Sequence, residues 1–187
     1  DTPLHPARAD PAHHPMKLPD DFTDACERLG ASLTEHCLHV NVAAQTLTHF
    51  HGDTANTLTA STSKRGTGQQ IDSFQTPLGL HRIVEKIGAN EPIGTIFKGR
   101  RPIETDGKGN SDAHITDRIL WLAGLDAGFN FGGTVDSYDR YIYIHGVGDE
   151  SNLGQPDSQG CIHLAATDLL PLFDAVPEGT LVFISEN

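Results

Sequence analysis

Hydrophobic positions near the start of the chain change from a helical to an alternating period. Between Pro19 and Leu29, apolar residues recur at the spacing of one helix face, and Gly30 follows where a helix would end. From Cys37 onward, apolar side chains occupy every second position, and a second run of this kind covers Thr46–Phe50. We therefore predict a short helix followed by a β-hairpin.

The later apolar runs are short and are separated by turns that contain glycine or proline, which is typical of β-strands. A second helix is expected near Thr167–Ala175, where Thr167 or Asp168 would cap the first turn and Pro171 falls early enough to be tolerated. The protein should therefore be mainly β. Further strands are expected at Thr57–Thr62, His81–Ile87, Thr95–Lys98, Arg118–Leu122, Arg140–His145 and Thr180–Ile184.

The length of 187 residues, with 37% hydrophobic content, suits one well-buried core and is short for two. We predict an N-terminal tail and short helix over residues 1–36 and a single domain over residues 37–187. Two connections, Thr105–Asp112 and Asp126–Asp139, are rich in small and polar residues. Such segments make poor core, so we expect them to form rims or lids over a site.

Charge limits the classes of partner. The formal net charge is −12, and the few Lys and Arg residues are scattered, which argues against nucleic acids and anionic membrane surfaces. No apolar run approaches the roughly 20 residues that a membrane-spanning helix needs. We expect a monomer with no nucleic-acid partner and no membrane-spanning segment in this chain.

Three cysteines are present: Cys26, Cys37 and Cys161. In an oxidising compartment the first two could form a disulfide and leave Cys161 free, whereas in the other interpretation they are two buried thiols. The sequence leaves both interpretations open.

Cys161 lies in a context that suits a nucleophile. A thiol is mostly protonated at neutral pH and needs a nearby imidazole or positive charge to become reactive. His145, at the end of an expected strand, could supply the imidazole, and the chain returns to Cys161 before a helix. Gly160 leaves room for backbone N–H groups to turn toward a developing oxyanion.

A motif in this region consists of His145-Gly146, a step of sixteen positions to Cys161, and the block Ser158-x-Gly160-Cys161. This motif resembles the signature of L,D-transpeptidases, the YkuD domain. Upstream, Thr76-Pro-x-Gly79 is similar to a turn of that family. The resemblance runs from about Leu38 to Ile184. It implies a YkuD-type mixed β-sandwich with one or two short helices.

The resemblance also implies a mechanism without a cofactor. Cys161 would be the nucleophile, His145 its general base and Gly146 the backbone carbonyl that orients the imidazole. The thiolate would attack a stem tetrapeptide of peptidoglycan, expel the terminal D-alanine and form a thioester. An amine of another stem would resolve it as a cross-link, or water would resolve it as in an L,D-carboxypeptidase. This activity belongs in the periplasm or another extracytoplasmic part of the bacterial envelope.

The remaining site residues expected from the motif would bind the oxyanion or the substrate. They are Gly160, Ser158, Gln159, His163 and Tyr143. Where the family usually has His and then Arg or Asn, this chain has Gln159 and His163. Gln159 cannot carry a proton, and His163 could replace an arginine only when protonated, so activity would fall as pH rises. The alternative function is a catalytically silent peptidoglycan-binding module.

No metal site is expected. His145, Cys161 and His163 are ligand types for zinc, but no Cys-x-x-Cys or His-Glu-x-x-His spacing accompanies them. His49 and His51 share a strand face and could bind a metal, yet an exposed strand face explains them without one.

Aromatic and cationic residues near the motif have less defined roles. Tyr141 and Tyr143 alternate onto the face of His145 and could line a pocket, and Trp121 is expected in the core. Arg118 and Arg140 are candidate partners for substrate carboxylates, and neither is assigned that role.

Overall fold

The computed structural model describes residues 17–103 and 114–187. Within these residues, two α-helices, α1 (Asp20–Leu29) and α2 (Ala166–Ala175), accompany a short 3-10 helix, η1 (Gly133–Val135). No helix in these segments is both long and apolar enough to cross a membrane. The strands are β1 (His36–Asn41), β2 (Thr46–His51), β3 (Thr54–Ser61), β4 (Gly79–Ile87), β5 (Ile96–Lys98), β6 (Arg101–Ile103), β7 (Thr116–Gly124), β8 (Tyr143–Gly146), β9 (Ile162–Leu164) and β10 (Leu181–Ser185).

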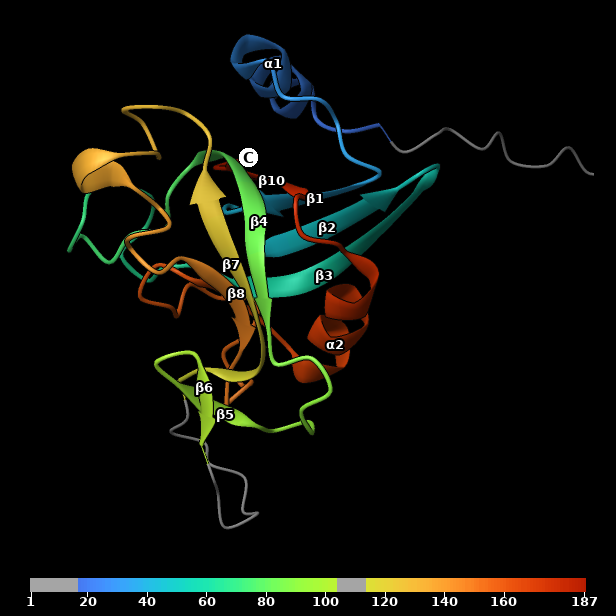
Figure 1. The fold of residues 1–187 in the computed structure, drawn as a ribbon, viewed down its shortest axis with the longest axis vertical. Coiled ribbons are helices and arrows are strands. Elements are labelled where there is room, and N and C mark those ends of the chain that lie inside the picture. The colour runs from blue at the N-terminus through green and yellow to red at the C-terminus, as the bar shows by residue number, and fades with distance from the viewer. Residues whose placement is uncertain (1–16, 104–113) are drawn as a thin grey trace, which may run out of the picture.

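The strands form one sheet in the order β4-β10-β1-β2-β3-β9-β8-β7-β5-β6, and an additional pairing of β4 with β7 closes it on itself. The β1–β10 and β8–β9 pairs are parallel, while the other pairs are antiparallel. Figure 1 shows α1 above one end of the sheet and α2 against its side. The predicted mainly β fold, with mixed pairing and two helices, is confirmed.

Both faces of strand β1 are buried. Leu38 and Val40 face the main core, which the sheet encloses together with Leu169, Leu172 and other residues of α2. Cys37 faces the opposite way, into a second apolar cluster beneath α1. Each face therefore contributes to a different cluster, as the period-two pattern requires.

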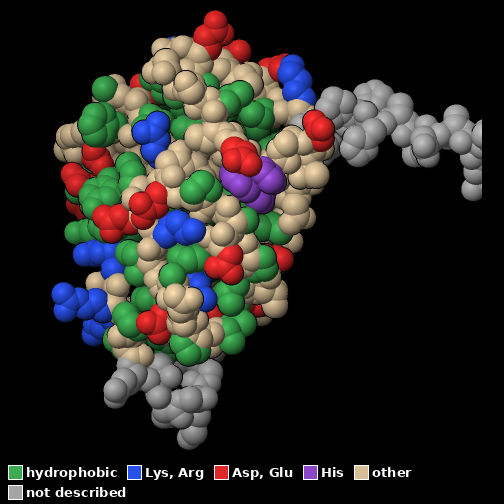
Figure 2. All heavy atoms as spheres, turned by 45° about the vertical axis from the view of Figure 1, so that its right-hand side comes forward, with side chains coloured by type: hydrophobic (Ala, Val, Ile, Leu, Met, Phe, Trp, Pro, Cys, Tyr) green, Lys and Arg blue, Asp and Glu red, His purple; other side chains and the backbone are tan. Residues whose placement is uncertain are grey.

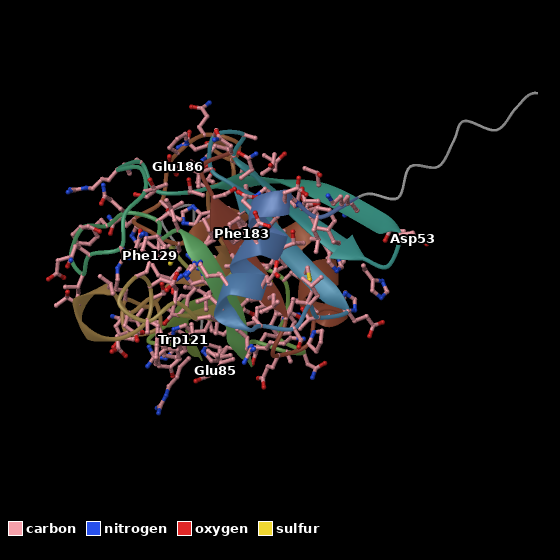
Figure 3. All side chains as sticks on the ribbon, turned by 90° about the horizontal axis from the view of Figure 1, so that it is seen from above. Asp53, Glu85, Trp121, Phe129, Phe183 and Glu186 are labelled. Atoms are coloured by element: carbon pink, nitrogen blue, oxygen red, sulfur yellow. The ribbon has the colours of Figure 1, made fainter. Side chains whose placement is uncertain are left out.

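Helix α1 forms where the sequence predicts it. Its apolar stripe buries Phe22, whose ring lies 5.2 Å from that of Phe183, and Figure 3 shows the helix lying over the sheet near Phe183. Gly30 ends the helix in a left-handed conformation with φ +63°. Burying a phenylalanine of this kind contributes about 1.5–3 kcal/mol, which anchors the helix to β4 and β10.

Cys26 and Cys37 lie in this second cluster as buried free thiols. Of the two interpretations that the sequence left open, the structure therefore shows two buried thiols rather than a disulfide. Burial raises the pKa of the Cys26 thiol, which keeps it protonated and poorly reactive.

Several expected elements differ from the structure. The expected strand Arg140–His145 begins only at Tyr143, because residues 138–141 form a turn in which Tyr141 has φ +56°. Cys161 is followed by β9 rather than directly by a helix, and neither β9 nor β6 was expected. The predicted connection Thr105–Asp112 lies outside the described residues. The other predicted connection, Asp126–Asp139, forms turns and η1.

The expected cap of α2 is also wrong. The helix starts at Ala166, and neither Thr167 nor Asp168 caps it. Instead, the Ala166 N–H donates to the Glu150 carboxylate at 2.8 Å. A carboxylate at this end stabilises the helix dipole, but the partner comes from a loop that sequence proximity does not reveal.

Candidate active site

A cleft with a cavity volume of about 620 Å³ opens where β8 and β9 lie side by side. His145 from β8 and Cys161, just before β9, both line it, together with Ser158 and Gln159 from the preceding loop. The parallel register pairs His145 with His163. The sheet therefore brings together two segments that the sequence analysis singled out, and gathers five of the eight expected site residues around one cavity.

The His145 imidazole is held as a neutral base. Its Nδ1–H donates to the Gly146 carbonyl at 2.7 Å, which directs the lone pair to Nε2. The side chain is buried, and this burial, followed by the effect of His163, lowers its pKa to about 3. At neutral pH the ring is uncharged and can accept a proton.

Gly146 is fixed by close packing. A Cβ atom added there would lie 2.4 Å from Asp117 Oδ2 and 2.8 Å from Thr116 Oγ1. The Asp117 carboxylate is itself held by Gly94 N–H at 2.6 Å and by the Thr116 hydroxyl at 2.6 Å. Only glycine fits this position, and its carbonyl is thereby held against the imidazole of His145.

A tight turn presents Cys161. The Ser158 hydroxyl donates to the Cys161 carbonyl at 2.6 Å and accepts the Gly160 N–H at 3.1 Å. The Thr76 hydroxyl donates to the Gly160 carbonyl at 3.0 Å. Gly160 has φ +121°, and a Cβ there would lie 3.2 Å from the Gln75 carbonyl oxygen, so the turn requires glycine.

The Cys161 thiol is partly exposed at the cleft. It donates to the Tyr141 carbonyl at 3.3 Å and accepts the Tyr143 N–H at 3.4 Å. Burial raises its pKa to about 11, and the Tyr143 N–H and the charge of Arg140 lower it only in part. Among the described residues no hydrogen bond joins the thiol directly to His145. The resting pair is therefore a neutral thiol and a neutral imidazole, and proton transfer has to accompany attack.

The two tyrosines contribute differently from the expectation. Tyr143 is buried in a cluster with Trp121 and offers the thiol its backbone N–H, whereas its ring does not line the cleft. Tyr141 lies outside the strand but does line the cleft, and its ring lies 5.8 Å from that of Trp121. The left-handed residue at Tyr141 breaks the alternation on which the expectation relied.

Arg140 lines the cleft and was not assigned a role from the sequence. Its guanidinium donates to the carbonyls of Gln75, Gln69 and Gly68 at 2.6, 3.0 and 3.2 Å. These bonds tie the segment that supports Gly160 to the turn that precedes β8. Arg118, by contrast, is buried and donates to the carbonyls of Glu91 and Asp117, away from the cleft.

The two departures from the family motif have different surroundings. Gln159 is exposed at the rim of the cleft. The His163 ring lies 4.8 Å from that of His145, and burial lowers its pKa to about 4. His163 is therefore neutral at neutral pH, so it does not supply the positive charge of an arginine there.

The protonation state of Cys161 can be measured by alkylation. Because only the thiolate reacts, and the thiol pKa is raised to about 11, the rate of modification by iodoacetamide should rise about tenfold per pH unit from pH 7 to 10. Peptide mapping by mass spectrometry separates Cys161 from the buried Cys26 and Cys37. A plateau at neutral pH would instead reveal a preformed thiolate and imidazolium pair.

Comparison with known proteins bears on this geometry. The family model for the L,D-transpeptidase catalytic domain, YkuD, matches residues 35–184. No curated protein matches the sequence. Among solved structures, an L,D-transpeptidase from Mycobacterium tuberculosis H37Rv is 17% identical with a TM-score of 0.52, covering 81% of this chain and 58% of that one.

Two further structures show the same fold. L,D-transpeptidase 3 from Mycobacterium tuberculosis is 14% identical with a TM-score of 0.51, covering 81% of this chain and 61% of its own. Bd1075 from Bdellovibrio bacteriovorus is 16% identical with a TM-score of 0.51, covering 83% and 49% respectively. This chain thus matches about half to three fifths of the length of these proteins.

Proposed function

The chain belongs to the L,D-transpeptidase catalytic domain family, and on that basis we propose that it is a cysteine acyltransferase acting on peptidoglycan stem tetrapeptides. The observation that carries this proposal is the parallel pairing of β8 with β9. It brings a neutral base, His145, and a thiol, Cys161, to the same cleft.

In the first step, the Cys161 sulfur attacks the peptide carbonyl that precedes the terminal D-alanine, while His145 Nε2 takes the thiol proton. Substrate binding has to bring the thiol within reach of His145, since catalytic hydrogen bonds are often long before substrate binds. The Gly160 N–H is held by Ser158, which leaves the Cys161 N–H as the proposed donor to the oxyanion. His145 then protonates the departing amine of D-alanine, and a thioester remains.

In the second step, an amine attacks the thioester carbonyl and His145 removes a proton from the amine. The C–S bond then breaks, a new peptide bond remains, and His145 returns the proton to the Cys161 sulfur. Four carboxylates line the cleft, from Asp72, Asp139, Asp149 and Asp157. Lys64, 3.9 Å from Asp157, and Arg140 also line the cleft, so the four carboxylates leave it with net negative charge, which attracts a protonated amine that then loses a proton before it attacks. This supports transfer to a second stem peptide over hydrolysis, although water would give an L,D-carboxypeptidase at the same site. Because peptidoglycan lies outside the cytoplasm, the proposed reaction takes place in the extracytoplasmic part of the cell envelope.

The proposal is tested by incubating the protein with a disaccharide tetrapeptide from peptidoglycan. We expect mass spectrometry to show loss of D-alanine and formation of a cross-linked dimer, and a carbapenem to add its mass to the protein. Binding of the fragment without turnover or adduct between pH 5 and 9 would support the silent module instead.

A further inference from the structure

A group of histidines lies outside the cleft, at one end of the β1–β2 hairpin. His36 and His51 are directly paired across the two antiparallel strands, and His49 is two positions before His51 on the same face. Glu35 immediately precedes β1. Figure 2 shows a histidine cluster on an exposed face with acidic side chains against it. None of these four residues lines the cleft that contains Cys161.

Three contacts link the four side chains to one another. His36 Nδ1 lies 2.8 Å from His49 Nε2, and His51 Nε2 donates to Glu35 Oε1 at 3.1 Å. The rings of His36 and His51 stack with centroids 4.1 Å apart. One ligand atom from each of Glu35, His36 and His51 lies within 4.8 Å of the others.

We propose that Glu35, His36, His49 and His51 bind a divalent transition-metal ion, Zn²⁺ in the first instance. Three imidazoles and one carboxylate are a ligand set that suits Zn²⁺, whereas Ca²⁺ and Mg²⁺ require oxygen ligands. Ligands around a tetrahedral Zn²⁺ ion at about 2.0 Å lie about 3.3 Å apart. The contacts of 2.8 and 3.1 Å are close to that separation, and the His49 ring, whose centroid lies 6.4 Å from that of His51, would have to turn toward His51 to complete the site.

The directions of two pKa shifts in the group are consistent with this geometry. Burial lowers the pKa of His49, and the neighbouring His36 and His51 lower it further, so this ring offers a free lone pair at neutral pH. His51 lowers the pKa of the Glu35 carboxyl, which keeps it ionised. His36 Nδ1 and His49 Nε2 share one proton in their hydrogen bond, and the proposed metal ion would take the place of that proton.

The bound ion would serve the fold rather than the reaction. It would join the segment before β1 to the end of β2, next to the projecting β2–β3 hairpin, whose tip Asp53 marks in Figure 3. This role lies beyond the proposed acyltransferase function and does not depend on it. The sequence pattern drew attention only to His49 and His51, because their partner His36 lies 13 positions earlier in the chain.

The test measures Zn²⁺ binding to the full chain by calorimetry after treatment with EDTA. We use the Cys161→Ala background, so that the cleft thiol cannot contribute. We expect one ion per chain, a melting temperature that rises with Zn²⁺, and at least about tenfold weaker binding in E35Q/H51Q. Both substituted residues are exposed, so the variant should fold as the parent does, which its melting temperature in EDTA checks.

A matched control removes histidines elsewhere. His13 and His14, adjacent in the N-terminal tail, are replaced by alanine, and this variant should bind Zn²⁺ as the parent does. Binding that survives in E35Q/H51Q but disappears in H13A/H14A overturns the proposal. The same conclusion follows if the parent binds no Zn²⁺.

Discussion

Replacing Cys161 by alanine should reduce turnover of the stem tetrapeptide by at least about 10⁴-fold and remove the carbapenem adduct. Every covalent step of the proposed reaction runs through this sulfur. Its hydrogen bonds, at 3.3 and 3.4 Å, are weak, so we expect the loss of stability to stay below about 1 kcal/mol. Mass spectrometry of the intact protein measures the adduct, and a thermal melt verifies folding.

A matched variant separates loss of the nucleophile from damage to the cleft. Ile71→Ala shortens an exposed side chain that lines the same cavity and should retain adduct formation. If Cys161→Ala still acquired the carbapenem mass, another residue would be the nucleophile and the proposed mechanism would be wrong.

Replacing His145 by glutamine should reduce kcat/KM by about 10²- to 10⁴-fold, the contribution of a general base. The glutamine amide can still donate to the Gly146 carbonyl, but it cannot accept the thiol proton. The sign of the pH effect distinguishes this role from a structural one. With His145 present, its pKa of about 3 and the thiol pKa of about 11 predict an activity nearly constant from pH 5 to 9.

Without the base, activity depends on spontaneous ionisation of the thiol and should rise about tenfold per pH unit over the same range. The control is His163→Gln, which alters the neighbouring neutral ring at 4.8 Å and should keep the flat profile. A flat profile in the His145 variant would show that the imidazole only supports the structure. Activity of the parent that falls as pH rises would instead support a protonated His163.

Local patterns predicted much of the fold. The helical stripe, with Pro19 before it and Gly30 after it, located α1 to within one residue, because both residues act on the backbone next to them. Alternation located β1 and β2. The strands that sequence reasoning missed, β6 and β9, are three residues each, too short to show a period.

The site shows the same division between local and distant information. His145, Cys161, Ser158 and Gly160 were predicted because they form one motif, and the structure gathers them at one cleft or its supporting turn. The sequence did not assign a role to Arg140, because the carbonyls that its guanidinium binds lie far away in the chain. Gly68, for example, is 72 positions away. Tyr143 does alternate with His145 in β8, but its ring is buried against Trp121 of β7, a contact that the local pattern does not reveal.

The position of β10 has a consequence for how the chain reaches its fold. This last strand inserts between β1 and β4, so residues near both ends of the domain must meet before the sheet can close. Such non-local pairing is slow, because loop closure costs entropy before contacts reward it. During synthesis the early strands therefore stay incomplete until Leu181–Ser185 are made, because Leu38 and Val40 lack their parallel partner until then. A chain that stops before Leu181 leaves β1 and β4 as open edges that can pair with other chains.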